Sequence, residues 1–453
     1  MTEWIGAAEA AARLGIKPAS LYAYVSRGVL TRRQDPGGRA SLYDAREIAR
    51  LARKGRPRRV PAGSELVIET AVTQIAAGHL RYRGQDVTEL AARCDFEEVA
   101  LLLWGGVPAT GERGGWQATA VALAAGRTAQ SALPEHILPL ERLQVIVPAL
   151  AALDPLRLQL DPPAVIAAAR AMIAGMVGSL PPPSPPGRHG HAGTAAAAAP
   201  TAGLCGSPEA GSIAERLAAV LHAGPPPGAR LSSKTGPRPG SAPSMALAGV
   251  VRTALVLLAD HELAASTLAA RVAASVRADP YAVVSAGLGA FSGTLHGGAS
   301  LAVEAMLGSA GSADDAPRVV GDLLRRGQRI PGLGHFAYPA GDPRCVVLMR
   351  VIGEYAPASP RLAAARAVIG ETRRRALPEP SVDFALGTLT SVAGLVPGSG
   401  EAIFAVARAA GWIAHALEEY ARNAPIRLRA VYTGPAPAGS TAGNQRGSAG
   451  IGS

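Results

Sequence analysis

The chain has 453 residues, enough for more than one domain and a sizeable core, and its low aromatic content (4%) beside abundant Ala and Leu favours helices over sheets. Its three cysteines, Cys94, Cys205 and Cys345, lie too far apart for disulfide or metal-ligand spacing. The N-terminus has no basic-then-apolar signal, and no uncharged apolar run approaches the roughly 20 residues that span a bilayer. We therefore expect a cytoplasmic protein with no metal site and no membrane contact.

The net charge of +11 is concentrated at the N-terminus. Residues 1–60 hold 13 Lys and Arg against 5 Asp and Glu, whereas the remaining 393 residues are close to neutral. This asymmetry indicates an anionic partner for the N-terminal segment alone.

Residues 1–58 predict a small module of short helices and a hairpin. Helices are expected at residues 7–14 and 18–27 around a tight turn, and a hairpin at residues 30–43. Asp44-Ala45-Arg46-Glu47 then matches a capping box, which predicts a third helix to about residue 53.

This N-terminal pattern resembles the helix-turn-helix of the mercury-resistance-regulator (MerR) type with its wing. The resemblance implies that the helix at residues 18–27 enters a major groove of DNA, with Arg32, Arg33 and Arg39 on phosphates. The alternatives are a remnant of DNA binding and a basic docking module that touches no DNA.

A second domain is expected at residues 59–434, after a basic, proline-bearing linker. Residues 66–72 have the β-branched character of a strand. Apolar residues at helical spacing, separated by Gly or Pro, predict a series of helices. These helices are expected at residues 87–93, 96–104, 116–132, 140–153, 163–176 and 213–222, with almost continuous helix after residue 245.

Two segments of this domain, residues 180–202 and 224–244, are low-complexity sequence rich in Pro, Gly or Ala. Such segments bury too little apolar area to order themselves, so we expect mobile loops. Residues 435–453 are mostly Gly, Ser, Ala and Pro, which predicts a disordered tail.

One glycine-rich loop combines a histidine with an arginine: Gly332-Leu333-Gly334-His335-Phe336-Ala337-Tyr338-Pro339-Ala340-Gly341-Asp342-Pro343-Arg344. The glycines permit unusual backbone angles, the prolines stiffen the loop, and an arginine can hold a carboxylate with two parallel hydrogen bonds. The loop therefore suits an anionic small molecule. Taken alone, it is also compatible with a structural turn.

Two further segments favour the functional interpretation. Ser292-Gly293-Thr294-Leu295-His296-Gly297-Gly298-Ala299 precedes the loop, and Pro380-Ser381-Val382-Asp383-Phe384-Ala385-Leu386 follows it. In order and spacing the three segments resemble the catalytic segments of the citrate synthase family: S-G-x-L-H-G-G-A, then G-H-x-x-Y-x-x-x-D-P-R, then a lone aspartate. The resemblance extends from about residue 66 to residue 434.

The resemblance implies an all-α citrate synthase fold behind a small winged helix-turn-helix domain. A large helical domain and a small one, at about residues 297–395, would enclose the site, and the active form would be an obligate homodimer. The implied substrates are acetyl-CoA and oxaloacetate, and no cofactor beyond the coenzyme A thioester is expected.

Claisen-type chemistry requires a base for the α-carbon and donors for the oxygens where negative charge develops. The resemblance assigns the base to Asp383, the donor to the thioester oxygen to His296, and the donor to the oxaloacetate carbonyl to His335. A helix is expected after His296, and the field at its N-terminus would lower the imidazole pKa and favour a neutral donor.

The resemblance also implies the substrate-binding residues. His261, in Asp260-His261-Glu262, would contact oxaloacetate, while Arg344, Arg408 and Arg427 would bind carboxylates, Arg427 in the site of the partner subunit. Glycine-loop backbone would hold the adenine of coenzyme A. Many members of the family have a basic residue for the phosphates shortly after the G-H, but Phe336-Ala337-Tyr338-Pro339 contains none, so we expect arginines just before the loop to take its place. These residues are Pro331, Gly332, Leu333 and Gly334 for the adenine, and Arg325, Arg326 and Arg329 for the phosphates.

The sequence thus predicts an acyltransferase of the EC 2.3.3 type, which condenses acetyl-CoA with oxaloacetate to citrate, the citrate-forming step of the tricarboxylic acid cycle. Two alternatives stay open: a 2-methylcitrate synthase that uses propionyl-CoA, and a DNA-binding regulator whose synthase-like domain only senses a metabolite. An intact Asp383 favours an enzyme, and the basic N-terminus favours the regulator.

Overall fold

The computed structural model describes residues 4–14, 21, 24–25, 30–35, 41–53, 68–105, 116–183, 211–223 and 245–430. The chain divides into two compact units, residues 1–69 and residues 70–453, and each is described by itself. The helix expected at residues 18–27, the two low-complexity segments and the tail lie wholly or mostly outside the described residues.

The first unit is a three-stranded antiparallel sheet with helices. Its elements are β1 (Trp4–Gly6), α1 (Ala7–Leu14), β2 (Arg32–Gln34), β3 (Ser41–Asp44) and α3 (Ala45–Arg53). The strand order is β1-β3-β2, and Ile5 of β1 pairs with Tyr43 of β3. The first helix, the hairpin and the third helix are as expected. The strand β1 was not predicted, since three residues are too short to show a period.

The start of α3 differs in detail from the expected capping box. The Asp44 carboxylate accepts the Arg46 backbone N–H at 2.8 Å, so the cap itself is present. The Glu47 carboxylate instead accepts the backbone N–H and the hydroxyl of Thr31, at 2.6 and 3.1 Å. Glu47 therefore joins α3 to the residue just before β2 rather than closing the box.

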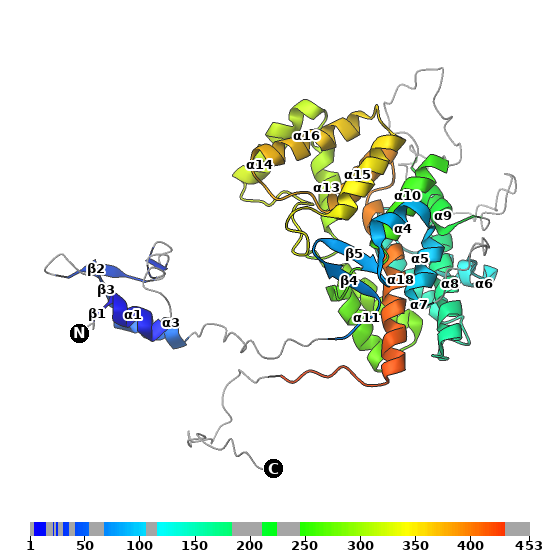
Figure 1. The fold of residues 1–453 in the computed structure, drawn as a ribbon, viewed down its shortest axis with the longest axis horizontal. Helices are drawn as coiled ribbons and strands as arrows, with labels where there is room; N and C mark the ends of the chain where they lie inside the picture. The colour runs from blue at the N-terminus through cyan, green and yellow to red at the C-terminus, as the bar shows by residue number, and fades with distance from the viewer. Residues whose placement is uncertain are drawn as a thin grey trace, which may run out of the picture. The chain divides into compact units, whose positions relative to one another are not determined.

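The second unit begins with a small antiparallel sheet, β4-β5-β6, and continues as helices (Figure 1). The strands are β4 (Thr73–Ala76), β5 (His79–Tyr82) and β6 (Gln85–Asp86). The helices up to the second low-complexity segment are α4 (Val87–Arg93), α5 (Phe96–Leu103), α6 (Ala120–Gln130), α7 (Pro139–Ala151), α8 (Pro162–Ser179) and α9 (Ile213–Leu221). Those after it are α10 (Met245–Leu258), α11 (Ala265–Ser275), α12 (Pro280–Phe291), α13 (Ala299–Gly308), α14 (Ala316–Arg325), α15 (Pro343–Tyr355), α16 (Pro360–Arg374), α17 (Val382–Ala393) and α18 (Ser399–Arg422), with a short 3-10 turn, η1 (Ala313–Asp315).

Side-chain caps explain where several helices begin. Asp86, Asp161 and Asp279 each accept a backbone N–H from the first turn of the helix that follows. The helix expected at residues 116–132 begins only at Ala120, because the Thr119 hydroxyl accepts the Ala122 N–H at 3.2 Å. The strand expected at residues 66–72 was placed too early, because the β4–β5 ladder starts at Thr73.

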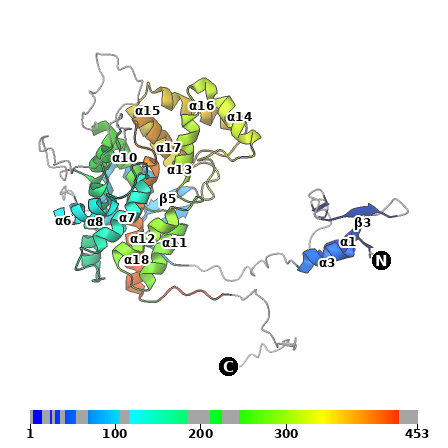
Figure 2. The same ribbon diagram turned by 180° about the vertical axis from the view of Figure 1, so that it is seen from behind.

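The main core is built around α18, whose residues from Ser399 to Ala416 are all buried. This helix contacts α10, α11, α12 and α17 among others, and both views show it within the helical body (Figures 1 and 2). Close approach is possible because Gly287 of α12 lies against Trp412, where a Cβ would be 2.6 Å from the indole ring.

A second, smaller core is formed by apolar residues of α13, α14 and α16 together with Ile330 and Phe384. The helix α17 joins the two cores: Phe384 packs in the smaller one, while Ala385 and Leu386 pack in the main one. Asp383 lies at this junction, in the first turn of α17.

One helix of the described residues, α8, is long and apolar enough to cross a membrane by length and composition. Half of it is buried within the protein, and Met172, Ile173 and Met176 are fully covered. Its apolar character is accounted for by its place in the main core.

Candidate active site

The turn after α10 carries His261. The ring is almost fully buried, and its Nε2 lies 2.9 Å from the Tyr338 hydroxyl. Burial, with the positive charges of Arg344 and Arg408, holds the pKa of His261 well below its usual value. Glu262 next to it has a left-handed backbone (φ 50°), which is uncommon for a residue with a Cβ. The histidine is therefore neutral and held in a specific turn.

The glycine-rich loop is attached to the segment that carries Asp383. The Gly334 N–H donates to the Glu379 carbonyl and the Ser381 N–H donates to the Gly332 carbonyl, both at 2.8 Å. Gly332 has φ +70°, and a Cβ there would lie 2.9 Å from the Phe384 Cα. The loop and the start of α17 thus form one unit, which requires glycine at residue 332.

His335 lies in this loop beside His261, with 5.0 Å between the ring centroids. Its Nδ1 accepts the Ala337 backbone N–H at 3.2 Å, so the neutral ring carries its proton on Nε2. Burial and the charge of Arg344 lower its pKa to about 4. His335 is accordingly a neutral N–H donor near pH 7.

Two buried guanidinium groups lie close to these histidines. The Arg344 side chain lies over the Tyr338 ring and is held by Asp342. The Arg408 Nε donates to the Leu258 carbonyl at 2.9 Å, while its Nη2 has no hydrogen-bond partner among the described residues. Burying an arginine nitrogen without a hydrogen-bond partner costs free energy unless an anion accepts its hydrogen bonds. The unpaired Nη2 of Arg408 therefore suggests a carboxylate ligand.

His296 lies between α12 and α13, as expected, and α13 begins three residues later. Its Nε2 is 2.8 Å from the Ser266 hydroxyl, and its ring contacts Phe291. Its pKa is lowered to about 4, the expected direction. The causes are burial, which is the larger, and the charge of Arg408, while a contribution of the helix field stays a prediction.

Asp383 is partly buried, and its Oδ2 lies 3.3 Å from the Ser381 hydroxyl. Burial raises its pKa to about 6, against the opposing charge of Arg344. Such a carboxylate is a stronger base than an exposed one but is still ionised near pH 7.

Four residues of this region were not predicted from the sequence: Ser266, Tyr338, Asp342 and Glu401. Glu401 is 5% exposed, and burial, with the charges of Glu304, Glu141 and Asp383, raises its pKa to about 7. Asp342 and Tyr338 lie inside the quoted loop, so their position beside His335 was the available signal.

Some predicted residues are not brought to this cluster. Arg427 follows α18 and is exposed, as are Arg325, Arg326 and Arg329 at the end of α14. The described parts of the chain contain no group of three or more His, Cys, Asp or Glu that could hold a metal ion.

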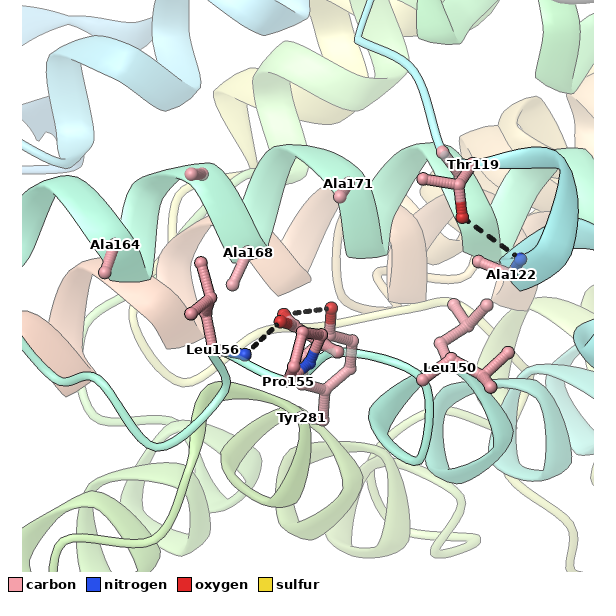
Figure 3. A pocket seen from close by; sticks show the side chains of 13 residues that line it. Thr119, Ala122, Leu150, Pro155, Leu156, Ala164, Ala168, Ala171 and Tyr281 are labelled. Atoms are coloured by element: carbon pink, nitrogen blue, oxygen red, sulfur yellow. Dashed lines mark hydrogen bonds between the residues drawn. The ribbon is translucent and has the colours of Figure 1, made fainter.

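A pocket of about 270 Å³ lies elsewhere, between α6, α7, α8 and α12 (Figure 3). Its lining is mostly Ala and Leu, with the Tyr281 hydroxyl donating to the Asp154 carboxylate at 2.9 Å. It contains no histidine or arginine, so it is not the site of the chemistry described above.

The fold of the second unit is the helical citrate synthase fold. A citrate synthase from Thermotoga maritima superposes with a TM-score of 0.61 at 26% identity, over 82% of this chain and 94% of that one. The citrate synthase from Thermoplasma acidophilum, solved as a ternary complex with carboxymethyl coenzyme A and oxaloacetate, gives a TM-score of 0.62 at 25% identity, over 82% of this chain and 94% of that one.

The sequence model "Citrate synthase, C-terminal domain" matches residues 63–429, and the chain belongs to the citrate synthase family. It is 41% identical over 202 residues to a citrate synthase of Haloferax volcanii, covering 43% of this chain and 52% of that protein. It is 29% identical over 379 residues to a 2-methylcitrate synthase of Mycobacterium tuberculosis, covering 82% and 88%. The match thus spans about half the length of the first relative and most of the second.

Proposed function

We propose that the protein is a citrate synthase that condenses acetyl-CoA with oxaloacetate. The observation that carries the proposal is the convergence of two neutral histidines, His261 and His335, with two buried guanidinium groups, Arg344 and Arg408. Neutral donors polarise a ketone, and buried arginines hold carboxylates, so the set suits a small keto-dicarboxylate.

The carbon–carbon bond forms in two linked steps. The Asp383 carboxylate removes a proton from the α-carbon of the thioester, and His296 donates to the thioester oxygen, where enolate charge develops. If the Ser266 hydroxyl donates to Nε2 of His296, the ring carries its proton on Nδ1, and Nδ1–H is the donor. Ser266 thus selects the tautomer of His296.

The α-carbon then attacks the ketone carbon of oxaloacetate, and the Nε2–H of His335 donates to the ketone oxygen, where alkoxide charge develops. This oxygen becomes the citryl hydroxyl by a net uptake of one proton, which balances the proton that Asp383 removed from the thioester. The carboxylates are held by the free N–H groups of Arg344 and Arg408, while His261 contacts the same substrate. Water next attacks the thioester carbonyl of the bound citryl-CoA, the C–S bond breaks, and citrate and the free thiol of CoA leave.

The coenzyme A portion is assigned to the loop at residues 331–334 for adenine, and to Arg325, Arg326 and Arg329 for phosphates. Exposure of these three arginines supports a role on a solvated phosphate chain. No cofactor is needed, since the thioester supplies the driving force for the reaction.

We also propose an active homodimer. The helix α11 and the residue that caps its C-terminus expose Leu268, Val272 and Val276 at helical spacing, an apolar stripe that a second subunit would cover. In such a dimer the exposed Arg427, beyond the end of α18, would complete the site of the partner subunit. The protein would act in the cytoplasm.

Methylcitrate synthesis from propionyl-CoA is the second candidate activity, favoured by the 29% identity to a 2-methylcitrate synthase across 82% of the chain. A free-thiol release assay with oxaloacetate tests both candidates. Acetyl-CoA is expected to give the higher kcat/KM. A preference for propionyl-CoA would support the methylcitrate reaction, and no thiol release with either thioester would contradict both.

The N-terminal unit is proposed as a winged helix-turn-helix module that binds DNA. The excess of basic residues at positions 1–60, and the exposure of Arg32 and Arg33 on β2, support a surface for anions. The test is binding of duplex DNA by the full chain as the salt concentration is raised. Affinity that does not fall with salt, or no binding at low salt, would contradict the assignment.

A further inference from the structure

The turn that carries His261 is attached to α18 at three successive points. The Arg408 Nε donates to the Leu258 carbonyl at 2.9 Å, and the Gly411 N–H donates to the Ala259 carbonyl at 3.0 Å. One turn of α18 further, His415 Nε2 lies 3.2 Å from the Asp260 carboxylate. The turn therefore follows one face of the helix over two helical turns.

Close contact between the turn and the helix depends on Gly411. A Cβ at this position would lie 2.3 Å from the Asp260 Oδ1 and 2.5 Å from the Ala259 carbonyl oxygen. The turn is also held from its other side, because the buried Tyr82 hydroxyl accepts the Asp260 N–H at 3.0 Å. The backbone that leads into His261 has little room to move.

The third contact, between His415 and Asp260, is part of a network of buried charged groups. Arg271 Nη1 lies 2.6 Å from His415 Nδ1, and Arg271 Nε donates to the Glu419 carboxylate at 2.6 Å. Asp260, His415 and Arg271 are fully buried, and Glu419 is nearly so. None of these four side chains takes part in the proposed condensation.

The chain of bonds determines the tautomer of His415. A guanidinium group can only donate, so Nδ1 must accept from Arg271, and the neutral ring must carry its proton on Nε2. That proton then points to the Asp260 carboxylate. The hydrogen bond from Arg271 thus determines which nitrogen of His415 donates to Asp260. A network of this kind holds the turn in one conformation, which apolar packing alone would not do.

We propose that His415, Asp260 and Arg271 are positioning residues for the substrate site. They hold the turn that carries His261 in one conformation. They also hold the Leu258 carbonyl, which orients Arg408, so that both side chains are placed to bind oxaloacetate. This rests on the proposed function, since oxaloacetate is the ligand whose affinity the positioning controls.

Two substitutions of His415 distinguish the hydrogen bond of its Nε2 from that of its Nδ1. His415→Gln places an amide donor near the Nε2 position and can keep the bond to Asp260. His415→Asn places its amide near Nδ1, so it can keep the contact with Arg271 but leaves Asp260 buried without its donor. We expect His415→Asn to weaken oxaloacetate binding about ten-fold, the size expected for one displaced buried hydrogen bond, and His415→Gln to stay within about three-fold of wild type.

Tyr281→Phe is the matched control, because it removes a hydrogen bond to a carboxylate from an equally buried residue at the pocket of Figure 3. It is expected to lower the free energy of unfolding without changing oxaloacetate affinity. The measurements are the oxaloacetate dissociation constant by calorimetry, KM for each substrate, and unfolding by denaturant. For His415→Asn we expect the KM for the thioester to stay within about two-fold.

The outcomes separate this inference from the proposed function. Wild-type protein that does not bind oxaloacetate would show that the proposed function is wrong, and this inference with it. Wild-type protein that binds oxaloacetate, while His415→Asn binds it equally well, would overturn the positioning role alone. If His415→Asn does not fold, Glu419→Gln tests the other end of this buried hydrogen-bond network. The affinity for oxaloacetate is then expected to fall about three-fold, and an unchanged affinity would overturn the inference.

Discussion

The Arg344 guanidinium makes two hydrogen bonds to the Asp342 carboxylate, 3.0 Å from Nε and 2.8 Å from Nη2, and both side chains are buried. The same carboxylate accepts the Val382 N–H at 3.0 Å, next to Asp383. Asp342 therefore fixes Arg344 and the start of α17 together, and Arg344 Nη1 would be available to the carboxylate ligand proposed above. This shared anchor relates the proposed base to a proposed substrate-binding group.

Asp342→Ala should destabilise the protein strongly, because it leaves the Arg344 charge buried without its partner. Breaking such a pair typically costs about 3–5 kcal/mol in the free energy of unfolding. Asp342→Asn, which keeps the shape and one acceptor, should cost less. Denaturant unfolding of the two variants checks this, and a loss below about 1 kcal/mol for Asp342→Ala would show that solvent compensates Arg344.

Asp383→Ala should abolish most thiol release while oxaloacetate still binds. Removing a positioned base should lower the rate by about 10²–10⁴. The assay is initial rate of thiol release, with oxaloacetate affinity measured in parallel to show that the site is intact. A variant that kept most of the wild-type kcat would exclude Asp383 as the base.

The rate of condensation should rise with pH in a step that begins near pH 6, and the nearby Glu401, with a pKa of about 7, is expected to broaden this step. The base must be ionised to act, and burial places the Asp383 pKa at about 6, so the rate increases as pH rises through that value. His296 and His335, with pKa values of about 4, remain neutral across the same range and add no second step. A pH profile of kcat/KM checks this, with unfolding followed at each pH. An ascending step well above pH 7 would assign the titration to another group.

Deleting residues 1–58 should leave the condensing activity largely intact. The proposed reaction uses residues of the second unit alone, and the two compact units divide after residue 69. The measurement compares kcat and KM of the full and shortened chains, with folding and oligomeric state checked for both. A shortened protein that is folded and dimeric but inactive would contradict the division of roles.

Arg427→Lys should impair the use of oxaloacetate more than Arg429→Lys does. A lysine cannot replace the two parallel hydrogen bonds of an arginine to a carboxylate, and Arg429 is a suitable control because both arginines are exposed. The KM for oxaloacetate of each variant checks the difference. Equal effects of the two substitutions on this KM would contradict the assignment of Arg427 to the substrate site.

Mixed dimers test whether Arg427 acts across the subunit boundary. If each site takes Asp383 from one chain and Arg427 from the other, mixing Arg427→Ala and Asp383→Ala proteins creates one site with both wild-type residues. Activity above both parents is then expected once subunits have exchanged. No gain in dimers whose exchange is confirmed would show that Arg427 acts within its own chain or outside the site.

The sequence by itself determined the helical family fold of the second unit and the segments that form its candidate site. Helix limits were predicted best where local signals set them: α1 and α4 begin and end at the expected residues 7–14 and 87–93. Caps, apolar periodicity and glycine loops act over a few residues, so a linear pattern contains them.

Only the tertiary structure decided which groups meet and in what state of charge. Ser266 is 30 residues from His296, and Asp260 is 155 residues from His415, yet each pair is in hydrogen-bond contact. Such pairs follow from how α11 and α18 pack, which no local pattern states. The lowered pKa of His296 likewise has burial as its main cause, and burial is a property of the folded core rather than of neighbouring residues along the chain.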